Sequence, residues 1–98
     1  MNVRHENPDL LRLETDKTFS AKLAPAIVGS FRSKMNFIRN ALDERDFRAM
    51  RSLRFEKLHG DRAGQWSMRL NDQYRLIMKI EEGTPKNTVV ILEIADYH

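Results

Sequence analysis

The sequence predicts an α+β fold in which helices come first and a small antiparallel β-sheet follows. Apolar residues up to about position 50 recur at helical spacing, whereas from Leu53 onward they alternate with polar residues, as in strands with one buried face. Helices followed by a run of strands are typical of the α+β class. The 98 residues contain no linker-like segment, so we expect one domain over residues 1–98.

The first half of the chain predicts one extended segment and two helices. Residues 10–14 predict a short strand or extended arm. Apolar residues between about 20 and 42 recur every three or four positions, which places them on one helix face. These residues are Ile27, Phe31, Met35, Ile38 and Leu42. Pro25 suits a first helical turn and marks the start. The acids that open residues 43–50 favour a second, shorter helix there.

The second half predicts a three-stranded antiparallel meander. Residues 66–70 and 74–80 each alternate apolar and polar side chains. The pair Asn71-Asp72 between them tolerates the left-handed backbone of a tight hairpin turn. Residues 81–87 contain a glycine and a proline and predict a second turn. Residues 88–94 are apolar and β-branched, which is typical of a central strand.

Composition excludes several kinds of site. The chain has no cysteine, so thiolate nucleophiles, zinc ribbons and iron–sulfur clusters are excluded. Its three histidines have no metal-binding spacing, and we expect neither metal nor cofactor. No apolar run approaches the ~20 residues of a membrane span. The first twelve residues are charged and lack a signal-peptide pattern, so we expect a cytoplasmic protein that does not contact a membrane.

Arginine dominates the basic residues. The net charge is only +3, but 11 of the 17 basic residues are arginine. Arginine contacts phosphate and carboxylate groups in a planar, bidentate manner that lysine cannot reproduce. One interpretation is a polyanionic partner, either nucleic acid or an acidic protein. The other is an ordinary solvated surface.

Basic side chains gather around the predicted hairpin. Arg69 and Arg75 flank its turn and lie off the apolar stripes, so we expect them to share one face of the sheet as cross-strand neighbours. Residues 60–64 form either an ordinary flexible loop or part of the same basic surface. The basic residues next to this loop are Arg54, Lys57, His59 and Arg62.

The chain ends in Asp96-Tyr97-His98, which brings a carboxyl, a phenol and an imidazole together directly after an apolar strand. One interpretation is a frayed tail. The other is an acid–base site acting on RNA, whose 2′-OH is a built-in nucleophile. His98 and Asp96 would then share the proton transfers, while Tyr97 would stack on a base or orient the ribose. Arg69 and Arg75 would hold the scissile phosphate, so the reaction needs no metal in principle.

Two segments resemble the HigB-type killer proteins of the RelE superfamily. Residues 58–76, LHGDRAGQWSMRLNDQYRL, follow the pattern in which Gly-Asp-Arg precedes Ser-x-Arg and then Asn-x-Gln-Tyr-Arg. Residues 94–98, IADYH, match the Asp-Tyr-His ending of that family. The two segments cover about a quarter of the chain, in the expected order and at the expected separation.

The resemblance implies a RelE-like fold, with two N-terminal helices on an antiparallel sheet. It implies a toxin that cleaves mRNA on the translating ribosome, and a HigA-type helix-turn-helix antitoxin as partner. Operator DNA would be bound only through the toxin–antitoxin complex. By position, the tail residues Asp96, Tyr97 and His98 match the catalytic group. The strand arginines match residues that face RNA. We expect Arg75 and His59 to join the catalytic group, and we expect six residues to bind RNA: Arg54, Lys57, Arg62, Arg69, Asn71 and Tyr74.

The chain departs from the family pattern at the second proton-transfer group. Some relatives carry a catalytic histidine where this chain has Glu56, and either His59 or Lys57 is a candidate to replace it. Two other functions use the same basic surface without catalysis. One is a translation inhibitor that only occupies RNA or the ribosome, and the other is a subunit that docks the antitoxin as a corepressor.

We predict that His98→Ala, or deletion of residues 96–98, abolishes growth arrest while the protein still folds. General acid–base groups contribute about 10²–10⁴-fold to rate, so their loss should suffice. Growth after induced expression and circular dichroism of the purified variants measure the two properties. Full toxicity of the truncated chain would contradict the assignment.

Overall fold

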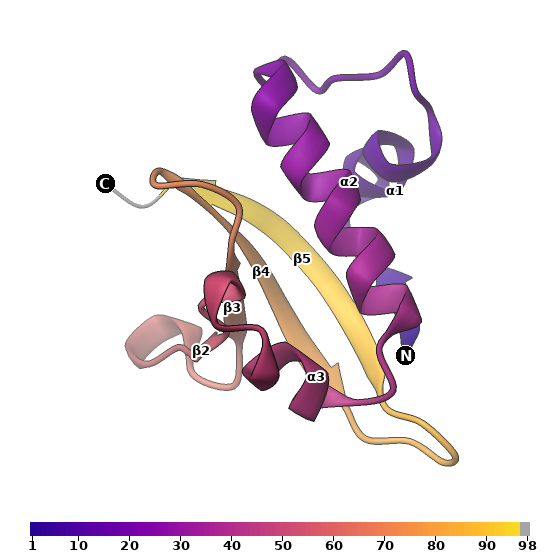
Figure 1. Cartoon of the computed structure of the whole chain (residues 1–98), viewed down its shortest axis with the longest axis vertical. Coiled ribbons are helices and arrows are strands. Elements are labelled where there is room, and N and C mark those ends of the chain that lie inside the picture. The colour runs from indigo at the N-terminus through magenta and orange to yellow at the C-terminus, as the bar shows by residue number, and fades with distance from the viewer. Residues whose placement is uncertain (97–98) are drawn as a thin grey trace.

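The computed structural model describes residues 1–96, in which helices cover one face of a five-stranded sheet (Figure 1). The helices are α1 (Pro8–Thr15), α2 (Pro25–Asn40) and α3 (Glu44–Ala49), with short 3₁₀ turns η1 (Arg51–Leu53) and η2 (Gly60–Arg62). The strands are β1 (Asn2–His5), β2 (Glu56–Lys57), β3 (Trp66–Arg69), β4 (Tyr74–Glu81) and β5 (Thr88–Asp96). The predicted α+β class is confirmed.

The sheet has the strand order β1-β5-β4-β3-β2. Strands β3, β4 and β5 form the predicted antiparallel meander. The sheet is nevertheless mixed, because β1 joins the outer edge of β5 in parallel and β2 joins β3 at the other edge. These two edge strands were not predicted, since four and two residues are too few to show an alternating pattern.

Helix α2 begins at Pro25, as predicted. Proline has no backbone N–H, but the N–H groups of a first helical turn have no partner within the helix, so no helical hydrogen bond is lost. The predicted apolar stripe faces the sheet, with Phe31, Met35 and Ile38 fully buried. The stripe ends earlier than predicted, because the helix stops at Asn40 and leaves Leu42 with 73% of its surface exposed.

The prediction of a strand at residues 10–14 was wrong, because this segment belongs to helix α1. The Asn7 side chain caps the helix by accepting a hydrogen bond from the Asp9 amide, and Pro8 occupies the first turn. Leu10 and Leu13, three residues apart, are buried, whereas Leu11 between them is exposed. Three leucines in so short a run fit the spacing of a helix as well as that of a strand. The capping residues before them are what favour the helix.

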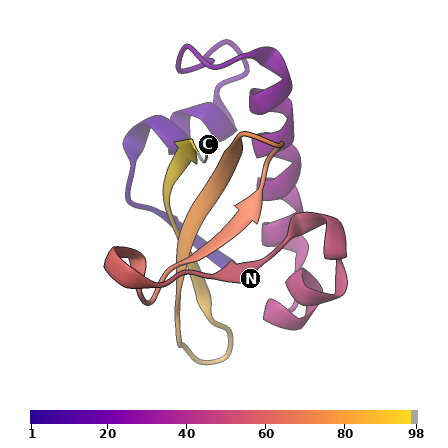
Figure 2. The same cartoon turned by 90° about the vertical axis from the view of Figure 1, so that its left-hand side faces the viewer.

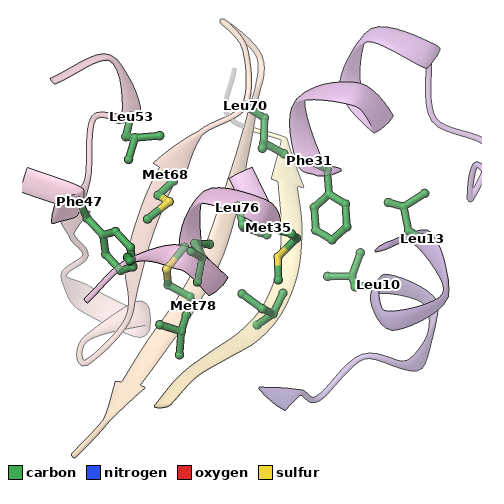
Figure 3. Packing of buried hydrophobic residues seen from close by; sticks show 14 of the residues in the cluster. Leu10, Leu13, Phe31, Met35, Phe47, Leu53, Met68, Leu70, Leu76 and Met78 are labelled. Atoms are coloured by element: carbon green, nitrogen blue, oxygen red, sulfur yellow. The ribbon is translucent and has the colours of Figure 1, made fainter. Parts of the chain in front are cut away.

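The core lies between the helices and one face of the sheet (Figure 3). Met68, Leu76 and Met78 point from the strands toward Phe31 and Met35 of α2. Figure 2 shows the sheet with α1 and α2 packed on the same side of it. We call this side the core face and the opposite side the pocket face. Within residues 1–96, no helix is long and apolar enough to cross a membrane.

A polar network joins the first strand to both long helices. The Glu14 carboxylate of α1 accepts hydrogen bonds from Arg39 of α2, at 2.6 and 2.8 Å, and lies 2.8 Å from His5 Nε2 of β1. The side chains of His5 and Glu14 are only 4% and 13% exposed. The Arg39 guanidinium holds the pKa of the Glu14 carboxyl below its usual value, although burial opposes this shift.

We predict that Glu14→Gln destabilises the fold by about 1–2 kcal/mol at neutral pH, because neutral hydrogen bonds replace charge-assisted ones. The lowered pKa means that the charged carboxylate contributes stability above its unfolded pKa of about 4.3, and loses it as pH falls through the lower folded value. Urea unfolding of both proteins at pH 7, 5 and 3 measures the difference, which should shrink below pH 4. Glu82→Gln, at an exposed site, is the control, and an equal effect there would contradict the role of the network.

Candidate functional site

The pairing of β3 with β4 places Arg69 directly opposite Arg75. Directly opposed residues point to the same side of a sheet, so both guanidinium groups emerge on the pocket face. Their neighbours Met68 and Leu76, also paired, point into the core. The shared face predicted for the two arginines is therefore confirmed.

A pocket of about 420 Å³ opens beside the two arginines. It lies over β2, β3 and the hairpin turn, on the face of the sheet that α1 and α2 leave uncovered. It is lined by Arg54, Glu56, Leu58, Ser67, Arg69, Asn71, Asp72 and Arg75. Three predicted RNA-binding residues, Arg54, Arg69 and Asn71, thus meet the predicted catalytic residue Arg75 in one pocket.

Arg75 is the most firmly held of these arginines. Its Nε donates to Ser67 Oγ at 2.9 Å, and its Nη2 donates to the Arg54 carbonyl oxygen at 2.6 Å. Ser67 is fully buried. Arg54 adopts a left-handed backbone, with φ +47°, at the end of η1, and its carbonyl oxygen accepts the Arg75 bond from that position. With two nitrogens bound, the guanidinium plane has a defined orientation, which favours recognition of a tetrahedral anion.

Arg69 is held more loosely. Its Nη2 forms an ion pair with the Asp72 carboxylate, whose side chain is 97% exposed. Exposed ion pairs are worth only about 0.2–1 kcal/mol, so an anionic ligand can replace this carboxylate at low cost. Asn71 shapes the turn itself, because its Oδ1 accepts hydrogen bonds from the amides of Gln73 and Tyr74.

Two polar side chains that contact Arg75 were not among the predicted site residues. Ser67 orients Arg75, and Glu56 places a carboxylate oxygen 3.8 Å from Arg75 Nη2. Glu56 was noted only as a departure from the family pattern. Its register partner in β3 is Ser67, which is why it reaches the pocket face. The sequence offered no signal for this placement, because the two residues of β2 are too few to show which of them faces the pocket.

Other predicted residues lie outside the pocket. Lys57 pairs in register with Trp66, and Tyr74 packs against the core, so both belong to the core face. Arg62 forms an ion pair with Glu93 at 2.6 Å and holds η2 against β5.

His59 and Asp96 also lie away from the pocket lining. His59 is exposed and precedes the first turn of η2. Asp96 pairs in register with Tyr74, which assigns it to the core face at the end of β5, and its Oδ2 accepts a hydrogen bond from Gln73 Nε2 at 3.0 Å. Tyr97 and His98 lie outside the described residues. Among residues 1–96, no three acidic or imidazole side chains gather closely enough to hold a metal ion.

We predict that Asp72→Asn tightens binding of inorganic phosphate to the pocket by up to about fivefold, because it removes the carboxylate that occupies Arg69. Titration followed by amide NMR shifts of the hairpin measures the affinity. Asp61→Asn makes the same charge change at an exposed site outside the pocket and should have little effect. Equal gains in both variants would show that net charge, rather than the pocket, controls binding.

Comparisons with known proteins agree with this architecture. The chain aligns end to end with the YoeB/ParE toxin from Agrobacterium tumefaciens, covering 100% of both chains at 18% identity with a TM-score of 0.60. YafQ from E. coli matches at 12% identity and a TM-score of 0.58, over 97% of this chain and 91% of its own. The RelBE2 toxin–antitoxin complex from Mycobacterium tuberculosis includes a chain with 24% identity and a TM-score of 0.51, over 98% and 96%. At these identities the likeness shows a shared fold.

Sequence comparison identifies the family. No match was found among curated proteins. The profile of the HigB-like toxins, described as RelE-like toxins of the type II toxin–antitoxin system HigB, matches residues 6–98. This range includes β3, β4 and all the residues that line the pocket. The chain therefore belongs to the HigB-like family of RelE-like toxins of type II toxin–antitoxin systems.

Proposed function

We propose that this toxin is an endoribonuclease that cleaves mRNA on the translating ribosome and so arrests growth. The observation that carries the proposal is the pocket in which Arg69 and Arg75 share one face with the Glu56 carboxylate. Two guanidinium groups suit a phosphodiester that gains negative charge, and a carboxylate beside them suits a proton transfer. Membership of a toxin family supports an activity that harms the cell.

The proposed reaction is an attack by the RNA 2′-OH on the adjacent phosphorus. A new P–O2′ bond forms while the P–O5′ bond breaks, which leaves a 2′,3′-cyclic phosphate and a 5′-hydroxyl. One group removes the 2′ proton, and a second donates a proton to the departing O5′. Arg75 and Arg69 stabilise the charge on the non-bridging oxygens. DNA lacks the 2′-OH and is not a substrate for this route.

The proposed proton-transfer groups come from two places. Glu56 lies in the pocket, 3.8 Å from Arg75 Nη2. The tail residues Tyr97 and His98 supply a phenol and an imidazole, two groups that the pocket lining does not contain. His59 and Lys57, the candidates that the sequence offered for this role, lie outside the pocket, so Glu56 takes their place in the proposal.

We also propose a HigA-type helix-turn-helix antitoxin as partner, with operator DNA bound only by the complex. Family membership in a toxin–antitoxin system supports this proposal, as does the structural neighbour described as a RelBE2 toxin–antitoxin complex. Since its proposed substrate is ribosome-bound mRNA, the toxin would act in the cytoplasm.

We predict that Arg75→Lys lowers mRNA cleavage by about 10²–10³-fold, because the single nitrogen of a lysine cannot reproduce the planar guanidinium that binds Ser67 and Arg54 and still faces the phosphate. Primer extension on mRNA in a translating extract measures the cut sites. Arg4→Lys, at an exposed site paired with Glu81, is the matched control. Glu56→Gln should reduce cleavage by a comparable 10²–10⁴-fold if this carboxylate transfers a proton.

A single 2′-deoxy substitution at the cut position should block cleavage of the message by the wild-type toxin. Transcripts that remain uncut while translation stops would contradict the nuclease and favour inhibition by occupancy. Cleavage that persists at the deoxy position would contradict attack by the 2′-OH.

A further inference from the structure

Four basic residues recur every third position beside the pocket. Arg48 lies on α3, Arg51 opens η1, Arg54 follows η1 and Lys57 lies on β2, and all four are exposed. The backbone is left-handed at Arg54 and turns the chain there, so Arg54 reaches the pocket while Lys57 lies on the opposite face at the same edge of the sheet. We call these four residues the basic edge. Figure 1 places α3 and β2 at the end of the sheet remote from α1.

The basic edge differs from the arginines of the sheet in its ion pairs. Basic side chains on the pocket face are paired with acids: Arg4 with Glu81, Arg62 with Glu93, Arg69 with Asp72, Arg75 with Glu56 and Lys79 with Glu6. No member of the basic edge forms an ion pair with any of residues 1–96. The preceding basic residue, Arg45, is also neutralised, because it binds Asp43 and lowers the pKa of that carboxyl to about 2.

The basic edge connects the pocket to an aromatic surface. Arg54 lines the pocket, whereas Lys57 pairs in register with Trp66 on the opposite face. Trp66 stacks on Phe55 with ring centroids 4.6 Å apart and an interplanar angle of 5°. The Arg48 guanidinium carbon lies 5.6 Å from the Trp66 ring centroid and 5.8 Å from that of Phe55. Unpaired cations therefore run around β2 from the pocket to a stacked aromatic pair.

We propose that the basic edge binds the phosphates of single-stranded RNA that flank the cleaved bond, with Arg48 and Arg51 as contacts outside the pocket. This inference rests on the proposed nuclease function and extends its substrate site. Three observations favour RNA over an acidic protein as the ligand. Arg54 belongs to both the basic edge and the pocket, three of the four cations are arginine, and Arg48 lies beside a partly buried aromatic pair, a combination typical of single-strand binding.

The test measures how binding of an uncleavable RNA depends on salt. The probe is a short oligoribonucleotide in which every ribose is 2′-O-methylated, so binding is separated from chemistry. Each phosphate contact to a single strand contributes about 0.7 to the slope of log affinity against log salt. The double variant Arg48→Gln/Arg51→Gln should therefore lose about 1.4 from this slope. Trp66, the only tryptophan, gives a direct fluorescence signal beside Arg48.

Two variants control for charge and folding. Lys22→Gln/Lys86→Gln makes the same charge change at exposed positions away from the basic edge and should leave the slope unchanged. Arg48→Lys/Arg51→Lys retains the charges and should restore most of the slope. Thermal unfolding of each variant shows whether the fold keeps its stability.

The outcomes separate this inference from the proposed function. If the wild-type chain cleaves mRNA but the Gln variant keeps the full salt slope, the inference fails and the nuclease stands. Three other results also overturn the inference. The Lys22/Lys86 control could lose the same part of the salt slope, or the wild type could fail to bind the probe. The third is an equal Trp66 response to a poly-glutamate peptide. If cleavage is absent in the message assay, the nuclease proposal fails whatever the slope.

Discussion

The register between β3 and β4 is the constraint on which the rest of the molecule depends. It sets Arg69 opposite Arg75 on one face and Met68 opposite Leu76 on the other. Because strand side chains alternate, a slip by one residue would exchange the faces, burying guanidinium groups and exposing the core. Asn71 holds this register through its hydrogen bonds to the amides of the turn. The same pairing therefore stabilises the fold and builds the pocket.

The pocket arginines are oriented by groups that are themselves buried or conformationally restricted. Arg75 donates to the fully buried Ser67 and to the carbonyl oxygen of Arg54, a residue in the left-handed region. A left-handed conformation costs a non-glycine residue of the order of 1–3 kcal/mol, which the surrounding structure must offset. Donors fixed in advance need little reorganisation when charge develops on a ligand. This rigidity suits a residue that stabilises charge on a bound phosphate, the role proposed for Arg75, more than it suits an ordinary surface cation.

The net charge of +3 conceals an uneven distribution of partners. Acidic side chains neutralise most of the basic side chains on the pocket face. The sheet alone therefore does not present the strongly positive surface that its arginines suggest. The pocket itself contains three arginines and two acids. The four residues of the basic edge lack acidic partners among residues 1–96, and there the positive potential is left for a ligand. Whether an arginine is available to bind a ligand therefore depends on its acidic neighbours more than on how many arginines the chain contains.

Local patterns in the sequence determined helix α2, the meander and the shared face of the hairpin arginines, because periodicity and turn chemistry operate over a few residues. Helix α1 was misassigned and β1 and β2 were missed, since short apolar or polar runs fit more than one period. Tertiary structure alone decided that Glu56 and Ser67 meet Arg75, and that Asp96 belongs to the core face with Tyr74. These placements follow from which strands pair and in which register, and such pairing joins residues that are distant in the chain.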